Sequence, residues 1–461
     1  MRRLAGAGRL GVRVSGCVAE AQLEVKQSKA LSGQVSVSGA KNAALAIMPA
    51  LILTDGVSRL ENVPASADVL NMIQLLEELG ATVRFDCQKS ELEVDTRRLD
   101  RWRVSPTLMR KMRASVFVLG PLLARFGRAE LAMPGGCVIG ARPINYHLQN
   151  LSRMGVEFDQ RDNLLRAEAM QLQARRLVLE YPSVGATINI ICAALQTPGC
   201  TEIVNAALEP ELLDLVAVLK KMGACIDLRV PATIEVEGGH LLRPINHRIM
   251  PDRLEAGVLL LAAAMTGGQI QLPDAPADTL DLFLLKLEEM GHIVACGSDG
   301  VGIDLHATPE PRAVSFVTRP YPGFPTDLQA PMMAAQCVAE GTSTIEETVF
   351  ENRLVHTREL QKMGAQIVCK RSKAMVTGVE ELYGAYVIAS DIRASSALVL
   401  AALAARGCTT MTGLHHWRRG YDQLEQKLRD LGAHISVHTQ ERQDNAQHHA
   451  GHSSKETEDS A

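Results

Sequence analysis

The feature that most constrains the fold is a short phrase that occurs six times along the chain. In each copy a Leu is followed three residues later by Leu or Met and then directly by Gly, as in Leu76-Glu-Glu-Leu-Gly80. The six glycines are Gly80, Gly155, Gly223, Gly291, Gly364 and Gly432, and consecutive ones lie 75, 68, 68, 73 and 68 residues apart. This regularity predicts six structural repeats of about 70 residues.

Each phrase predicts the end of a helix and the start of a strand. The two apolar residues lie on one face of a helix, and the charged residues between them face solvent. The Gly supplies the left-handed conformation that ends a helix. An alternating strand then follows, as in Thr82-Val83-Arg84-Phe85.

An earlier, Ala-rich helix is expected in every repeat, followed by Gly and a short strand. We expect these helices at 43–53, 114–124, 186–195, 256–265, 328–339 and 395–405, and the strands at 57–60, 129–132, 201–204, 269–272, 342–345 and 409–412. Small side chains let helices approach closely, so these helices are expected to be buried. The pattern indicates an α/β fold. It excludes purely helical repeats, and it excludes a Rossmann fold because no G-x-G-x-x-G follows a strand.

Composition excludes several classes of partner. The chain has 461 residues, with 48 basic and 52 acidic, and only 3% are aromatic, so we expect no nucleic-acid partner. The longest apolar stretches run about 12 residues, where a membrane span needs about 20, so we expect no membrane partner. The ten cysteines form no C-x-x-C and no zinc-ligand spacing. We therefore expect no metal or other cofactor, and reduced thiols in a cytoplasmic protein.

Polar residues stand where each Ala-rich helix begins: Lys41 with Asn42, Arg113, Ser183, Glu255, Asp327 and Arg393. Others follow the next strand: Cys137, Glu209, Arg353 and Arg419. Repeat symmetry places them at equivalent ends, where helix N-termini favour anions. Together with Lys and Arg side chains, this pattern predicts a ligand that carries phosphate and carboxylate groups. The alternatives are helix caps at Ser183 and Asp327, an ion pair of Arg393 with Asp391, and a solvated Lys41.

Cys137 differs from the other cysteines in its surroundings. It lies in the glycine-rich segment Pro134-Gly-Gly-Cys-Val-Ile-Gly-Ala-Arg-Pro143, close to Arg142. An exposed thiol beside a cation is expected to have a lowered pKa and to be reactive. Cys192, by contrast, lies in an apolar helix, as a structural cysteine would.

These motifs resemble the UDP-N-acetylglucosamine 1-carboxyvinyltransferases, or enolpyruvyl transferases, from about Val25 to Val437. The matching segments are Ser38–Ala44, Met112–Ser115, Pro134–Pro143, Pro182–Thr187, Phe324–Asp327, Glu347–Arg353, Asp391–Ser395 and Arg419–Tyr421. The resemblance implies a two-domain inside-out α/β barrel built from the six repeats, with the active site between the domains. One domain would comprise 23–40 and 252–438, and the other 41–251, including the Cys segment. Residues 1–22 and 439–461 are expected to be a disordered extension and a disordered polar tail.

The resemblance also implies a reaction. The enolpyruvyl group of phosphoenolpyruvate is transferred to the 3-hydroxyl of UDP-N-acetylglucosamine by addition and elimination, phosphate is released, and the sugar is committed to peptidoglycan. By the same resemblance, Lys41, Arg142 and Arg419 hold the donor phosphate and Arg393 the donor carboxylate. Cys137 protonates the enol carbon, and Asp327 takes the proton of the sugar hydroxyl. The implied substrate-binding residues are Asn42, Arg113, Ser183, Val184, Gly185 and Arg353.

Three positions depart from the family pattern on the acceptor side. Asn145 stands where an Asp is usual, Tyr181 where a Lys is common, and Arg418 where an Asp is usual. They keep open a paralogue that transfers the same group to another nucleotide, such as uridine monophosphate. A non-catalytic regulatory paralogue is the other alternative, and the retained Lys41 and Cys137 argue against it. The chain lacks the phosphate-loop phrases of the shikimate-pathway transferase, and no motif places a His beside Cys137 for a hydrolase.

Overall fold

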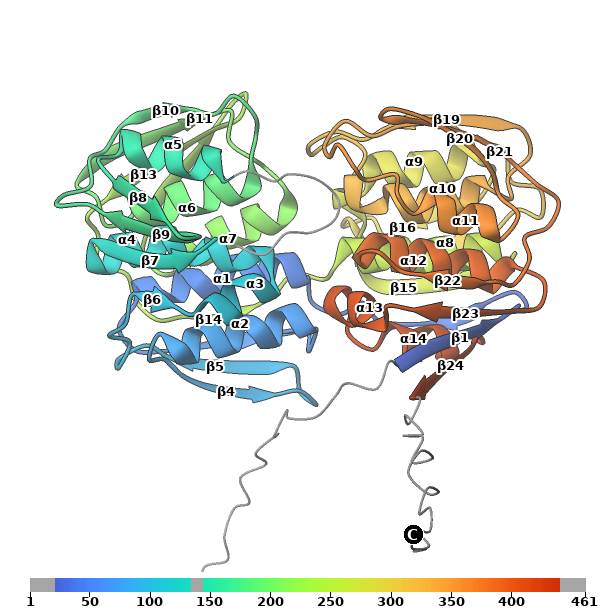
Figure 1. Cartoon of the computed structure of the whole chain (residues 1–461), viewed down its shortest axis with the longest axis horizontal. Coiled ribbons are helices and arrows are strands. Elements are labelled where there is room, and N and C mark those ends of the chain that lie inside the picture. The colour runs from blue at the N-terminus through green and yellow to red at the C-terminus, as the bar shows by residue number, and fades with distance from the viewer. Residues whose placement is uncertain (1–20, 134–143, 440–461) are drawn as a thin grey trace, which may run out of the picture.

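The computed structural model of the chain describes residues 21–133 and 144–439. Buried apolar residues form two separate clusters. One runs from Ala40 to Ile249, and the other combines residues between Leu23 and Val37 with residues between Leu254 and Ile435. We call the two parts the first lobe and the second lobe, and they lie side by side in Figure 1.

The first lobe is one continuous stretch of chain. Its elements are α1 (Lys41–Ala50), η1 (Leu51–Leu53), β3 (Val57–Glu61), α2 (Ala67–Glu78), β4 (Thr82–Asp86), β5 (Glu91–Asp95), β6 (Arg103–Val104), α3 (Pro106–Lys111), η2 (Arg113–Val118), α4 (Leu119–Phe126), β7 (Arg128–Ala132), α5 (Asn145–Arg153), β8 (Glu157–Arg161), β9 (Leu164–Glu168), β10 (Arg176–Val178), α6 (Val184–Ala194), β11 (Gly199–Val204), α7 (Pro210–Lys221), β12 (Cys225–Arg229), β13 (Thr233–Gly238) and β14 (Asn246–Arg248).

The second lobe takes two strands from the beginning of the described chain. Its elements are β1 (Ala21–Lys26), β2 (Ser32–Gln34), α8 (Arg253–Met265), β15 (Gln269–Pro276), η3 (Ala277–Thr279), α9 (Asp281–Glu289), β16 (Ile293–Cys296), β17 (Val301–His306), β18 (Phe316–Val317), η4 (Thr326–Leu328), α10 (Gln329–Gln336), β19 (Thr342–Glu346), α11 (Thr357–Lys362), β20 (Gln366–Lys370), β21 (Lys373–Thr377), β22 (Tyr386–Ile388), α12 (Ile392–Ala404), β23 (Cys408–Thr412), α13 (Leu414–Gly420), α14 (Leu424–Asp430) and β24 (His434–Thr439).

The strands of the described residues form six four-stranded sheets, one per repeat, and the sheets remain separate from one another. In the order β6-β7-β9-β8 the first pair is parallel and the other two pairs are antiparallel. Strands distant in sequence complete three sheets: β14 pairs with β3, β2 with β15, and β1 with β23 and β24. In each lobe the helices lie on the inside and the sheets on the outside (Figure 1). This is the expected inside-out α/β arrangement, but the described strands do not close into a barrel.

The strand β1 begins slightly before the expected end of the disordered extension. Ala21 pairs with Thr439, and Gln22 pairs with His438. The antiparallel ladder supplies hydrogen-bond partners to these terminal residues, so both ends of the ladder extend further than the sequence indicated. Residues 1–20 and 440–461 lie outside the described residues.

The Ala-rich helices are the buried ones, as the sequence predicts. Every residue of α10 is buried, and α8, α10 and α12 contact one another inside the second lobe. The 114–124 segment divides into η2 and α4, because Pro121 falls in the first turn of α4, where its missing N–H breaks no helical hydrogen bond. All six glycines of the repeated phrase have φ between 95° and 105°, which confirms the predicted helix ends.

The chain passes between the lobes twice, and the two crossings run side by side. Ala40 N donates to Met250 O at 2.7 Å, and Asp252 N donates to Ser38 O at 2.8 Å. A Cβ at Gly39 would lie 1.6 Å from the backbone oxygen of Asn62, so only glycine fits there.

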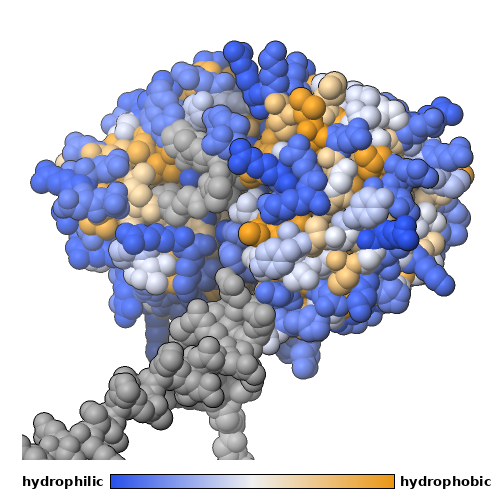
Figure 2. Space-filling model, turned by 45° about the vertical axis from the view of Figure 1, so that its right-hand side comes forward, coloured by the Kyte–Doolittle hydropathy of each residue, from blue (hydrophilic) through white to orange (hydrophobic). Residues whose placement is uncertain are grey.

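The face of the molecule in Figure 2 carries hydrophobic side chains in separate groups among hydrophilic ones. Apolar side chains among polar ones are ordinary on a protein surface, because apolar atoms contribute much of that surface. No helix among the described residues is long and apolar enough to span a membrane.

Candidate active site

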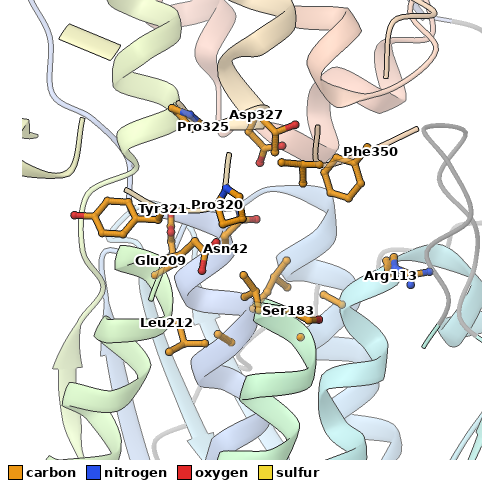
Figure 3. Close-up of a pocket in the computed structure, with 18 of the residues that line it drawn as sticks. Asn42, Arg113, Ser183, Glu209, Leu212, Pro320, Tyr321, Pro325, Asp327 and Phe350 are labelled. Carbon is orange, nitrogen blue, oxygen red and sulfur yellow. The ribbon is translucent and has the colours of Figure 1, made fainter. Parts of the chain in front are cut away.

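A cavity of about 690 Å³ is lined by residues of both lobes. The first lobe contributes the N-terminal ends of α1, η2, α6 and α7, and the second lobe contributes those of α8, η4 and α12. Figure 3 shows Asp327 and Phe350 of the second lobe above Asn42 of the first, with Ser183 and Arg113 on one side and Glu209 and Tyr321 on the other. Helix N-termini that converge on one space create a positive potential in it.

One ion-pair cluster joins the lobes at the N-terminal ends of α1 and α2. Lys41 Nζ lies 3.5 Å from Asp68 Oδ2, and Arg419 Nε of the second lobe donates to Asp68 Oδ1 at 2.8 Å. Asp68 is in the first turn of α2, where a carboxylate is favoured by the helix dipole. Burial lowers the pKa of Lys41, and the nearby Asp68 opposes that effect.

A second cluster surrounds Asp327 in η4. Arg353 Nη2 donates to Asp327 Oδ1 at 2.5 Å, and Arg393 Nη2 donates to Asp327 Oδ2 at 2.7 Å. Burial raises the pKa of Asp327, but the two arginines outweigh burial and hold that pKa well below its ordinary value of 3.8. Arg393 also donates from Nη1 to the hydroxyl of Tyr421 at 3.1 Å.

Two nitrogen atoms of Arg353 have no hydrogen-bond partner among the described residues of this cluster. They are Nε and Nη1, and the residue is 3% exposed. A buried guanidinium whose donors are unpaired is costly unless a ligand accepts from them. Arg353 also lines the cavity, so its guanidinium is a candidate partner for an anionic group.

The loop before Arg353 is fixed to the turn that carries Asp327. Glu347 accepts from the backbone N of Val349 at 2.8 Å and of Phe350 at 3.1 Å, and from Thr326 Oγ1 at 2.9 Å. Glu347 is 2% exposed, so these bonds satisfy a buried carboxylate. They fix the segment from Glu347 to Arg353 beside η4.

The α6 side of the cavity presents backbone N–H groups. Ser183 is the N-cap of α6, and its Oγ accepts from Ala186 N at 3.4 Å. Val184 and Gly185 follow in the cavity wall. A Cβ at Gly185 would lie 2.9 Å from His147 Cε1 and from Phe117 Cε1, so the wall requires glycine there.

The imidazole ring of His147, which packs against Gly185, is neutral and can donate from Nε2. Asn189 Oδ1 accepts from Gly120 N at 2.6 Å, so the amide nitrogen of Asn189 faces His147 Nδ1 at 2.8 Å. Nδ1 therefore accepts, and the ring hydrogen is on Nε2. Burial, followed by Arg113, lowers the pKa of His147 to about 3, so the ring stays neutral.

Glu209 and its neighbours occupy the other side of the cavity. Glu209 precedes α7, and burial raises the pKa of its carboxyl to about 7. Its Oε2 is buried without a partner among the described residues. Nearby, Arg253 of the second lobe pairs with Glu211 of the first at 3.0 Å, and both side chains are buried.

The cavity contains most of the residues that the sequence singled out. They are Lys41, Asn42, Arg113, Ser183, Val184, Gly185, Glu209, Asp327, Arg353, Arg393 and Arg419, together with Asn145 and Tyr181. Cys137 and Arg142 lie outside the described residues. The described His, Cys, Asp and Glu residues contain no group of three that could hold a metal ion.

Two predicted polar positions are not in the cavity wall. Glu255 pairs with Lys427 and accepts from Ser38 N at 3.0 Å beside the crossings, because it lies in the third position of α8 and faces α14. Arg418 is exposed on α13, outside the cavity lining, while its neighbour Arg419 faces inward.

Three charged residues of the cavity wall were not predicted from the sequence: Asp68, Glu211 and Arg253. They lie in the first turns of helices, like the residues that the sequence did single out.

Comparison with known proteins identifies the class to which this fold and cavity belong. A sequence model of EPSP synthase (3-phosphoshikimate 1-carboxyvinyltransferase) matches residues 25–428. The chain belongs to this family of carboxyvinyl, or enolpyruvyl, transferases. Within the family it is 44% identical to a UDP-N-acetylglucosamine 1-carboxyvinyltransferase of Geotalea uraniireducens over 414 residues, which are 90% of this chain and 98% of that protein. The protein of the same name from Halorhodospira halophila is 42% identical over the same shares of the two chains.

Solved structures agree on the fold. The enolpyruvyl transferase NikO from Streptomyces tendae superposes with a TM-score of 0.83 at 26% identity, covering 92% of this chain and 100% of that chain. EPSP synthase from Acinetobacter baumannii superposes with a TM-score of 0.72 at 17% identity, covering 91% and 100%. These neighbours confirm the enolpyruvyl transferase fold expected from the sequence.

Proposed function

We propose that this protein transfers the enolpyruvyl group of phosphoenolpyruvate to the 3-hydroxyl of UDP-N-acetylglucosamine and releases phosphate. The observation that carries the proposal is the grouping of Lys41, Arg353, Arg393 and Arg419 around one cavity that also contains Asp327. A donor with a phosphate and a carboxylate needs two such cationic subsites. The 44% identity to a UDP-N-acetylglucosamine 1-carboxyvinyltransferase supports the choice of acceptor.

The donor's two anionic groups go to different clusters. The guanidinium groups of Arg353 and Arg393 donate hydrogen bonds to the carboxylate. Lys41 and Arg419 hold the phosphate, together with Arg142 from the segment outside the described residues. These cations stabilise the charge that develops on the tetrahedral, phosphate-bearing intermediate.

The reaction needs one base and one acid. Asp327 accepts the proton of the sugar 3-hydroxyl as its oxygen bonds to C2 of the enolpyruvyl group, and Cys137 gives a proton to C3. Loss of a proton from C3 then re-forms the double bond as the C2–O bond to phosphate breaks. Asn42 and Arg113 bind the sugar and a substrate phosphate, and the N–H groups that follow Ser183 bind the diphosphate.

A second acceptor has a specific observation in its favour. Tyr181 and Asn145 line the cavity, at positions where the family resemblance leads us to expect Lys and Asp. Burial, followed by Glu209, raises the pKa of Tyr181 to about 12, so it presents a neutral hydroxyl. A smaller acceptor with fewer phosphate charges, such as uridine monophosphate, needs fewer cations at this wall.

Phosphate release is the direct test. The protein is mixed with phosphoenolpyruvate and with UDP-N-acetylglucosamine, uridine monophosphate or no acceptor. Release only with the UDP-sugar supports the main proposal. Release only with the monophosphate supports the second acceptor, and release with neither contradicts both.

We also propose the domain division expected from the sequence, 41–251 inserted between 23–40 and 252–438. The two apolar clusters on either side of the crossings support it. A cytoplasmic location, the lack of a cofactor, and roles in cell-wall synthesis, cell shape and cell division stay predictions.

A further inference from the structure

Asp68 lies at the centre of the only described ion-pair cluster that joins a cavity cation of the first lobe to one of the second. Its Oδ2 faces Lys41 Nζ at 3.5 Å, and its Oδ1 accepts from Arg419 Nε at 2.8 Å. Lys41 and Asp68 are 7% and 4% exposed. The carboxylate thus spans the boundary between the lobes inside the site.

We infer that Asp68 is a positioning residue that holds Lys41 and Arg419 together at the place where the donor phosphate binds. This inference rests on the proposed function for the identity of the donor. Asp68 makes no contact with the reacting atoms, and it acts through the two cations.

The geometry of Arg419 shows how the positioning works. Asp68 occupies the Nε edge of the guanidinium, and no described residue accepts from its two Nη atoms. Arg419 lines the cavity, so the Nη fork stays available to an anion there. A guanidinium held at one edge loses less side-chain entropy when its other edge binds a ligand.

The charges around Lys41 give Asp68 a second effect. The groups that act on Lys41 are Asp68 of α2, Arg393 of α12, Asp327 of η4 and Arg419 of α13. The carboxylate of Asp252 at the crossing accepts from Lys41 N at 3.4 Å, Glu211 of α7 is paired with Arg253, and Arg113 of η2 lines the same cavity. Burial lowers the pKa of Lys41, and Asp68 is the largest opposing influence. Asp68 therefore favours the charged form of Lys41, the form that phosphate binding requires.

A neighbouring hydrogen bond strengthens the same connection. Asp422, which follows α13, accepts from Ala65 N at 2.9 Å just before α2 begins. The first turn of α2 and the end of α13 are thus joined at two points. A change at Asp68 alone therefore leaves one of the two links between these elements.

The test compares Asp68→Asn and Asp68→Glu with the wild-type protein. In Asp68→Asn the KM for phosphoenolpyruvate should rise about tenfold or more while the KM for the acceptor changes less than about twofold. The alkaline limb of its pH profile should move to lower pH by about one unit, because Lys41 loses its carboxylate neighbour. Asp68→Glu should restore the alkaline limb. Asp281→Asn, which removes a first-turn carboxylate from α9 outside the cavity lining, is the matched control.

Binding of inorganic phosphate, measured by calorimetry, separates this inference from the proposed function. Weaker phosphate binding in Asp68→Asn supports the inference even if the wild-type protein turns over none of the acceptors. An unchanged KM for phosphoenolpyruvate and an unchanged alkaline limb would overturn it. So would a rise in both KM values together, or tighter phosphate binding, since the carboxylate would then be structural or a competitor.

Discussion

Arg393 donates to Asp327 at 2.7 Å, so the arginine proposed to hold the donor carboxylate also binds the carboxylate proposed as the base. Arg353 holds the other oxygen of Asp327 at 2.5 Å. An arginine pair lowers the basicity of the carboxylate between them. In the proposed mechanism the donor carboxylate gives both arginines a second acceptor, so Asp327 should become a better base as their hydrogen bonds to it weaken.

Replacing Asp327 by Asn should lower turnover by about 100-fold or more, because no other carboxylate accepts the hydroxyl proton at that position. The pKa of Asp327 lies well below 3.8, so the group stays ionised as the pH falls to the acid end of a usual assay range. Any loss of turnover of the wild-type enzyme at low pH should therefore come from the protonation of a group other than Asp327. Steady-state phosphate release checks the rate, and near-normal turnover of Asp327→Asn would refute the assignment. Asp304→Asn on strand β17, outside the cavity lining, is a control.

Cys137 should be alkylated faster than the described thiols. Burial raises the pKa of Cys192 and of Cys337 to about 12, and the pKa values of Cys87, Cys200, Cys225, Cys296 and Cys408 are also raised. Raised values leave little thiolate at pH 7, whereas Cys137 stands near Arg142 in sequence. Timed alkylation with peptide mass spectrometry measures each rate, and an epoxide phosphonate that resembles the donor should label Cys137. Labelling spread evenly over several cysteines would contradict the prediction.

Exchanging Tyr181 for Lys should tighten binding of a diphosphate acceptor. An ammonium at this wall of the cavity adds one charge-assisted hydrogen bond, which should lower the KM for UDP-N-acetylglucosamine by about five- to tenfold. The KM for phosphoenolpyruvate should stay the same. Tyr383→Lys adds the same charge at an exposed residue outside the cavity lining and serves as the control. Equal KM values in wild type and Tyr181→Lys would show that Tyr181 does not contact the acceptor.

Glu209 should make stability depend on pH near neutrality. Its pKa in the folded protein is about 7, above its ordinary value of 4.5, so between these values the folded protein binds a proton that the unfolded chain has lost. Stability is therefore lost as the pH rises through this window, by up to about 3 kcal/mol. Glu209→Gln lacks this titration. Relative to the wild type, this variant should therefore be more stable at pH 8 than at pH 5. Denaturant unfolding at the two pH values measures the difference in stability, and a difference that does not change with pH would exclude the effect.

The repeats, the buried helices and most cavity residues could be predicted because they depend on local patterns. The Leu/Met–Gly phrase determines a helix end within one turn, and all six copies end as expected. Asp68 could not be found in this way, because its partner Arg419 is 351 residues away. Glu255 occupies the repeat position that lines the cavity in other repeats. Its side chain instead pairs with Lys427 and accepts from Ser38 N beside the two crossings. Pairing between distant segments decides which equivalent positions become a site.

The adjacent crossings have a consequence for how such a chain can be cut and rejoined. The first lobe enters at Ala40 and leaves at Met250, and these two residues are hydrogen-bonded to each other at 2.7 Å. The two ends of the first lobe therefore touch, and the strands β1 and β2 pair with strands of the second lobe. A circular permutant that joins the paired residues Ala21 and Thr439 and opens the chain in either lobe keeps both passages. Excision of the first lobe requires only a short splice from Ser38 to Asp252, whose backbones are hydrogen-bonded at 2.8 Å.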